Sequence, residues 1–99
     1  MDLIESNKDS LKQLCVRYNV AQLYVFGSVT GTEFRGDSDI DFLVKFVSLD
    51  LKEYADNYFD FKFSLEDIFN RKIDLLEDKA IKNPYLRESI DMSKKLIYG

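Results

Sequence analysis

The sequence predicts one α/β (α+β) domain spanning residues 1–99, with a small mixed sheet of about three strands packed by helices in the order α-β-β-α-β-α. Three observations lead to this fold class. Three segments repeat apolar residues at the spacing of an amphipathic helix. Three shorter segments are rich in β-branched and aromatic residues, as strands are. The length of 99 residues and the 45% hydrophobic content suit a single globular domain.

The first half of the chain contains one predicted helix and two predicted strands. Residues 2–19 separate apolar from charged side chains at helical spacing, which indicates a helix. Residues 22–26 (QLYVF) form a strand that ends at Gly27, and residues 28–38 form a turn or short helical segment and a polar loop. Residues 39–47 form the next strand. One face of this strand carries Ile40, Phe42 and Val44, and the other carries Asp39, Asp41, Leu43 and Lys45.

The second half adds a helix, a strand and a last helix. Asp50 is expected to cap a helix that runs to about residue 69, although residues 58–63 also alternate as a strand would. Residues 72–76 (KIDLL) form the third strand. Asn83 as N-cap and Pro84 at the first helical position begin the last helix. Its apolar stripe, which runs to the end of the chain, consists of Leu86, Ile90, Leu96 and Ile97.

Composition excludes several kinds of site. The chain has 14 basic and 18 acidic residues, a net charge of −4, so we expect no direct nucleic-acid binding. The absence of histidine excludes Ser-His-Asp triads, Cys-His dyads and the usual zinc sites. One cysteine, Cys15, excludes an internal disulfide. We expect no signal peptide and no membrane span, and therefore a cytoplasmic protein.

Three aspartates lie in predicted strands, where aspartate is uncommon. Asp39 and Asp41 project from the same strand face, about 6.5–7 Å apart. Their mutual repulsion and desolvation need a compensating cation, and Mg²⁺ prefers such oxygen ligands. Asp74 lies between apolar residues of another strand. If the two strands are neighbours, three carboxylates converge, enough for two Mg²⁺ ions about 3.5–4 Å apart, as in nucleotidyl transfer.

Gly27 and Ser28 follow the first strand. Glycine lets a ligand approach the backbone closely, and a serine hydroxyl beside the free N–H groups of a helix start binds anions. We expect that anion to be the β- and γ-phosphates of a nucleoside triphosphate. One strand end would then hold the triphosphate and the next would hold the metals.

The segment GSVTGTEFRGDSDIDFLV, with Gly-Ser, ten residues and Asp-x-Asp, resembles the signature of the DNA polymerase beta-like nucleotidyltransferases. The short chain, the IDLL strand and the segment NPYLRESIDMSKKLIYG are similar to the minimal nucleotidyltransferase (MNT) branch. The resemblance implies the nucleotidyltransferase fold and that Asp39 and Asp41 bind both Mg²⁺ ions. It also implies that Asp74 completes the nucleophile-side metal and helps deprotonate the attacking hydroxyl, while Gly27 and Ser28 hold the triphosphate.

The resemblance also implies a biological role. MNT proteins usually act as antitoxins to a HEPN ribonuclease encoded beside them, by transferring AMP from ATP to a tyrosine of the toxin. An acidic antitoxin suits a basic RNA-cutting partner, with which it would form a hetero-oligomer, or it would form a homodimer. One position departs from the family pattern. Many MNT sequences have an arginine just before the glycine that corresponds to Gly31, whereas this chain has Thr30, so phosphate binding is weaker or Arg35 substitutes.

The sequence is also compatible with other interpretations. The protein could be a non-catalytic antitoxin that neutralises its partner by covering it, or a small-molecule nucleotidyltransferase, although those usually carry a second domain. The aspartates could be solvated strand-edge acids. The aromatic residues between Tyr54 and Phe69 are expected to form core and a protein interface, and Cys15 is expected to be a small core residue.

Overall fold

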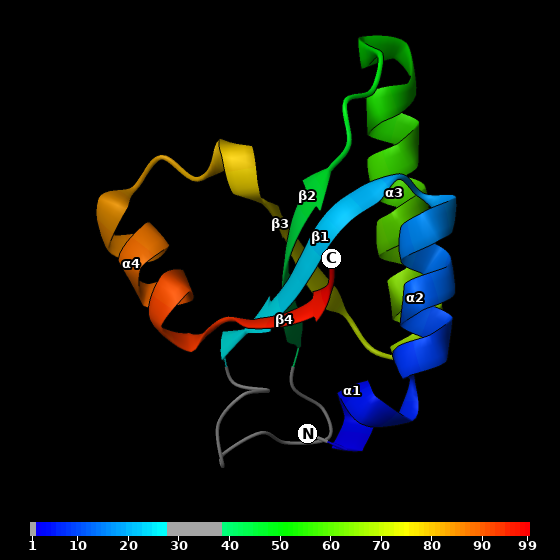
Figure 1. Ribbon diagram of the computed structural model, residues 1–99, viewed down its shortest axis with the longest axis horizontal. Helices are drawn as coiled ribbons and strands as arrows, with labels where there is room; N and C mark the ends of the chain where they lie inside the picture. The colour runs from blue at the N-terminus through cyan, green and yellow to red at the C-terminus, as the bar shows by residue number, and fades with distance from the viewer. Residues whose placement is uncertain (1, 28–38) are drawn as a thin grey trace.

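The computed structural model describes residues 2–27 and 39–99 and shows a four-stranded mixed sheet (Figure 1). The strand order is β3-β2-β1-β4. β1 pairs antiparallel with both β2 and β4, whereas β2 and β3 run parallel. The predicted α/β class is therefore confirmed. The strands are β1 (Val20–Phe26), β2 (Ile40–Phe46), β3 (Ile73–Glu77) and β4 (Lys95–Tyr98).

Helices cover both faces of this sheet. In Figure 1, α2 and α3 lie side by side on one side of the sheet and α4 lies on the other. The elements are α1 (Asp2–Ser6), α2 (Lys8–Arg17), α3 (Leu51–Phe69), the 3₁₀ turn η2 (Asp78–Ala80) and α4 (Pro84–Ser93). None of the described helices is both long and apolar enough to cross a membrane.

The main core lies between the sheet and α2 and α3. The predicted apolar face of β2, with Ile40, Phe42 and Val44, is fully buried there. On α3, Phe61, Leu65 and Phe69 recur every four residues and are buried against it. Cys15 of α2 is a buried core residue, as expected. Packing therefore decides in favour of a helix over residues 58–63, because Phe61 is buried in the main core at helical spacing from Leu65 and Phe69.

A second, smaller core lies under α4. Leu43 of β2 has 0% exposure and packs with Phe26 of β1 and Ile90 of α4. The sequence pattern placed Leu43 on the strand face that also carries aspartates and a lysine. In the structure, α4 covers this face at Leu43. The face of the sheet that carries the candidate carboxylates is therefore polar at one end and apolar in its middle.

The predicted continuation of the last helix to the end of the chain is wrong. Asn83 caps α4 as expected, with its Oδ1 accepting from the N–H groups of Tyr85 at 2.8 Å and Leu86 at 3.3 Å. The helix ends at Ser93, and Lys95–Tyr98 form β4 beside β1. Leucine, isoleucine and tyrosine suit a strand, and here they pair with a strand that would otherwise be a sheet edge. The sheet accordingly has four strands, and the element order ends in a strand.

The helix predicted over residues 2–19 is divided at Asn7 into α1 and α2. The Asn7 side-chain amide donates to the Leu3 carbonyl at 2.9 Å, which closes the first segment. Asn19, at a φ of 62°, then turns the chain into β1. Asn70, at a φ of 51°, does the same between α3 and β3. The turn at Asn70 returns the chain so that β3 lies beside α3.

Candidate active site

The parallel pairing of β2 with β3 places Asp41 directly opposite Asp74. Neighbouring strands are about 4.8 Å apart, and paired residues project from the same face of a sheet. The two aspartate-bearing strands are therefore neighbours, which is the condition under which we expected their carboxylates to converge. Asp39 precedes β2 and is exposed, and Asp74 is exposed as well, while Asp41 is half-buried.

The negative charges at this end of the sheet act on one another. The pKa of Asp41 is raised from 3.8 to about 6, first because burial disfavours its charged form, and then by the charges of Asp74 and Asp39. A side-chain hydrogen bond with Asp74 acts in the same direction. The predicted carboxylates are thus close enough for their negative charges to disfavour the ionised form of Asp41.

The donor set suits Mg²⁺. Mg²⁺ binds through one or two carboxylates and takes its remaining ligands from water and substrate phosphates. Asp41 and Asp74 offer such a pair, and Asp39 lies within electrostatic reach of Asp41. Within residues 2–27 and 39–99, however, no group of three or more His, Cys, Asp or Glu side chains is gathered as a metal cage. The described residues therefore supply a carboxylate pair rather than a complete set of ligands.

Gly27 contacts the Asp41 carboxylate. A Cβ built on Gly27 would lie 2.3 Å from Asp41 Oδ2 and 3.3 Å from its Cγ, well inside van der Waals contact. Gly27 also has a φ of +78°, which favours glycine. Besides its predicted place near a triphosphate, Gly27 therefore makes room for a candidate metal ligand. Ser28, Thr30 and Arg35 lie outside the described residues.

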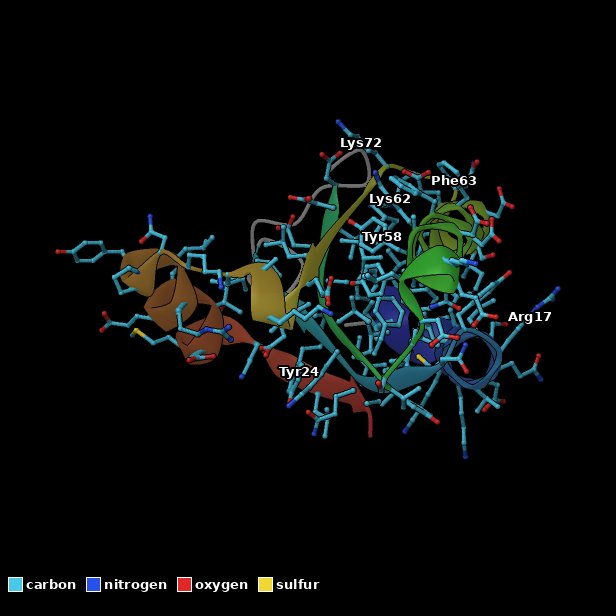
Figure 2. All side chains as sticks on the ribbon, turned by 90° about the horizontal axis from the view of Figure 1, so that it is seen from above. Arg17, Tyr24, Tyr58, Lys62, Phe63 and Lys72 are labelled. Atoms are coloured by element: carbon cyan, nitrogen blue, oxygen red, sulfur yellow. The ribbon has the colours of Figure 1, made fainter. Side chains whose placement is uncertain are left out.

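Two residues of α3 that sequence reasoning did not assign to the site flank Asp74. The Tyr58 hydroxyl donates to the carbonyl of Leu75, and Glu66 Oε2 accepts from the N–H of Ile73 at 3.3 Å. Figure 2 shows Tyr58 between α3 and β3. Burial, and then the charge of Asp74, raise the pKa of Tyr58. No sequence pattern marks these two residues, because their partners are backbone groups of β3.

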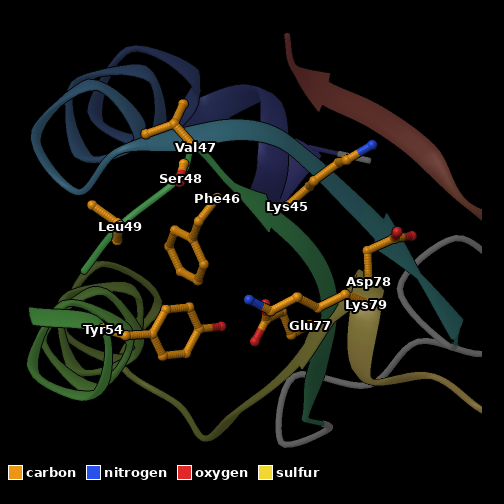
Figure 3. Close-up of a pocket in the computed structure, with 9 residues that line it drawn as sticks. All are labelled: Lys45, Phe46, Val47, Ser48, Leu49, Tyr54, Glu77, Asp78 and Lys79. Carbon is orange, nitrogen blue, oxygen red and sulfur yellow. The ribbon is translucent and has the colours of Figure 1, made fainter. Parts of the chain in front are cut away.

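A separate cavity of about 200 Å³ lies at the other end of β2 and β3 (Figure 3). Lys79 there lies 4.7 Å from the ring centre of Tyr54 and 3.3 Å from Glu77 Oε1. The Tyr54 hydroxyl is buried and has no hydrogen-bond partner among the described residues. The cavity contains none of the predicted site residues. Its lining consists of Lys45, Phe46, Val47, Ser48, Leu49, Tyr54, Glu77, Asp78 and Lys79.

Residues 9–99 match the family described as Polymerase beta, Nucleotidyltransferase. The protein belongs to this family. The nucleotidyltransferase is 36% identical over 97 residues to a protein of Methanocaldococcus jannaschii that is provisionally named a protein adenylyltransferase. That match covers 98% of this chain and 91% of the relative. The predicted enzyme class is therefore confirmed.

Solved structures agree on the nucleotidyltransferase fold. A protein provisionally described as a minimal nucleotidyltransferase has a TM-score of 0.77 and 29% identity, with 96% of this chain and 95% of that chain covered. A toxin–antitoxin crystallised with AMP-PNP has a TM-score of 0.70 and 23% identity, covering 94% and 73%. A tri-AMPylated HEPN toxin of Shewanella oneidensis in complex with an MNT antitoxin has a TM-score of 0.66 and 18% identity, covering 96% and 71%. The last two likenesses, both under 25% identical, establish a shared fold.

Proposed function

We propose that this nucleotidyltransferase transfers AMP from ATP to a hydroxyl group, that of a tyrosine, on a HEPN-domain toxin, and so acts as its antitoxin. The observation that carries the proposal is the register of β2 and β3, which places the Asp41 and Asp74 carboxylates side by side. The curated relative named for protein adenylylation supports a protein acceptor. The toxin–antitoxin neighbours, one with AMP-PNP and one with an AMPylated HEPN toxin, support ATP and the class of partner.

The proposal assigns a role to each carboxylate. Asp39 and Asp41 would hold both Mg²⁺ ions, and Asp74 would complete the site on the side of the attacking hydroxyl. Bound Mg²⁺ supplies positive charge that neutralises the triphosphate and lowers the pKa of the hydroxyl. The raised pKa of Asp41 supports this assignment, because burial and the negative charges of Asp74 and Asp39 disfavour its ionised form, which a bound cation would stabilise.

The chain's own residues position the substrates and move the proton. Gly27 and Ser28 hold the β- and γ-phosphates at the end of β1, the strand that pairs Phe26 with Asp41. The acceptor oxygen forms a bond to the α-phosphorus, the bond from that phosphorus to the bridging oxygen breaks, and pyrophosphate leaves. Asp74 accepts the hydroxyl proton. The rate enhancement comes mainly from positioning and charge stabilisation.

The charge of the chain supports a basic partner. A net charge of −4 gives favourable steering toward a positively charged RNA-cutting protein in the same compartment, here proposed to be the cytoplasm. The proposal therefore includes a hetero-oligomer of this chain with its HEPN partner. In a homodimer, the second copy would be similarly acidic and would gain nothing from this steering.

Transfer of label from α-labelled ATP to the neighbouring gene product tests the proposal. With Mg²⁺ present, the wild-type chain should label its partner, and Asp39→Ala or Asp41→Ala should abolish labelling. Asp56→Ala is the matched control, because Asp56 is an exposed aspartate of α3 away from the site. Undiminished labelling by either site variant contradicts the mechanism. An Asp39→Ala variant that still protects cells from the toxin would instead favour an antitoxin that acts by binding alone.

A further inference from the structure

β3, which carries Asp74, is an edge strand with β2 as its neighbour in the sheet order β3-β2-β1-β4. It has five residues. In a parallel ladder, alternate residues direct their backbone groups to the neighbouring strand and the residues between direct theirs outward. The bond from Ile40 N–H to the Lys72 carbonyl, at 3.3 Å, sets this alternation. The backbone N–H and C=O of Asp74 therefore point toward β2, and those of its neighbours Ile73 and Leu75 point toward the open edge of the sheet.

Two side chains of α3 occupy that open edge. Glu66 accepts from the outward N–H of Ile73 at 3.3 Å, and Tyr58 donates to the outward carbonyl of Leu75. These contacts lie one residue before and one residue after Asp74. Figure 2 shows Tyr58 reaching from α3 toward β3. The two contacts bracket the only residue of β3 that the proposed reaction uses.

α3 is a firm support for these contacts. Between and beside Tyr58 and Glu66, the residues Phe61, Leu65 and Phe69 are buried in the main core. The Asp74 side chain, in contrast, is exposed and is not held by packing. Apart from its side-chain hydrogen bond with Asp41, the position of its carboxylate is consequently set by the backbone of β3.

We propose that Tyr58 and Glu66 are positioning residues for the transfer reaction: they hold β3 in place from α3, so that the Asp74 carboxylate stays aligned with Asp41. The inference rests on the proposed function for its kinetic effect. Tyr58 and Glu66 would affect activation of the attacking hydroxyl, because that is the role assigned to Asp74. The triphosphate site at the end of β1 does not depend on it.

The chain offers matched variants. Tyr58→Phe removes only the hydroxyl that bonds Leu75. Tyr54→Phe makes the same change one turn earlier on α3, where the hydroxyl has no hydrogen-bond partner among the described residues. Glu66→Ala removes the acceptor for the Ile73 N–H, whereas Glu66→Gln keeps an acceptor oxygen and removes only the charge.

The kinetic test measures AMP transfer to the partner protein. Tyr58→Phe and Glu66→Ala should each lower kcat about tenfold, as expected for one misplaced hydrogen-bonded group, while the KM for ATP changes less than about twofold. Glu66→Gln and Tyr54→Phe should retain wild-type kcat. The inference is overturned if Tyr58→Phe has the same kcat as Tyr54→Phe. It is also overturned if Glu66→Gln and Glu66→Ala lose kcat equally.

A second measurement is independent of transfer. Hydrogen exchange followed by mass spectrometry should show faster exchange of the peptide containing β3 in Tyr58→Phe and Glu66→Ala than in Tyr54→Phe, with α3 unchanged. Mn²⁺ binding in the presence of AMP-PNP should weaken severalfold in the same two variants. Wild-type protein that transfers no AMP refutes the proposed function, and the exchange and Mn²⁺ results then still decide this inference. Unchanged β3 exchange together with unchanged Mn²⁺ binding refutes it in either case.

Discussion

Replacing Asp41 with asparagine should stabilise the metal-free protein while removing its activity. In the folded state, burial and the neighbouring charges of Asp74 and Asp39 raise the pKa of Asp41 from 3.8 to about 6. A carboxyl group with a raised folded-state pKa contributes its stability below the unfolded value, and that contribution is lost as pH rises through the folded value. Above about pH 6, without metal, the ionised Asp41 therefore destabilises the fold.

The magnitude follows from this pKa difference. The change from 3.8 to about 6 corresponds to about 3 kcal/mol at about 1.36 kcal/mol per pKa unit. Because Asp41 is half-buried and water screens part of its charge, we expect Asp41→Asn to raise the free energy of unfolding by about 1–2 kcal/mol at pH 7.5. For a domain of this size, that corresponds to roughly 4–12 °C in Tm.

The assay is urea and thermal unfolding of wild type and Asp41→Asn in the presence of EDTA at pH 7.5, repeated at pH 4.5. The stability difference should shrink to less than half at pH 4.5, because the folded wild-type carboxyl is then mostly protonated. Addition of Mg²⁺ with AMP-PNP should raise the Tm of wild type more than that of the variant. Asp56→Asn serves as a control and should show neither effect. An Asp41→Asn variant no more stable than wild type at pH 7.5 would refute the electrostatic reasoning.

Three further predictions concern single residues. Gly27→Ala should lower AMP transfer about 100-fold and the unfolding free energy by about 1–3 kcal/mol, because the new Cβ would lie 2.3 Å from Asp41 Oδ2 at a φ of +78°. Labelling of the partner measures the transfer, and urea unfolding measures the stability. Near-normal transfer would contradict this prediction. Burial raises the pKa of Cys15 to about 12, so the native thiol should not react with iodoacetamide at pH 8 until denaturant is added; rapid native labelling would show that Cys15 is accessible. Asn83→Ala should lower the unfolding free energy by about 1 kcal/mol, because α4 loses its N-cap, and should leave AMP transfer unchanged. An unchanged Tm would show that the cap does not stabilise the protein.

Sequence patterns predicted the features that depend on neighbouring residues. They did not predict the features that depend on contacts between distant parts of the chain. The alternation in β2 and the cap at Asn83 are local signals, and both predictions are confirmed. Local sequence does not determine whether Leu96 and Ile97 form a helix or a strand. Their apolar spacing continues the stripe of α4, but the vacant edge of β1 makes them part of a strand. Leu43 is a similar case, because its burial depends on α4, which begins 41 residues later in the chain.

The candidate site shows the same division. The aspartates were conspicuous in the sequence because strands seldom carry them. Their alignment was conditional on the pairing of β2 with β3, which no local pattern specifies. The contact of Gly27 with Asp41 depends on the pairing of β1 with β2 in turn. The bonds from Tyr58 and Glu66 to β3 could not be foreseen, because their partners are backbone groups, whose positions follow only from the fold.

We assign Asp41 to a carboxylate site that transfers AMP to a partner protein. The most direct measurement is the intact mass of both chains after the protein is mixed with its neighbouring gene product and MgATP. We predict an increase by whole AMP units on the partner with wild type and none with Asp41→Asn, which should remain folded. The same mass increase with Asp41→Asn, or an unmodified partner with wild type, would contradict the claim.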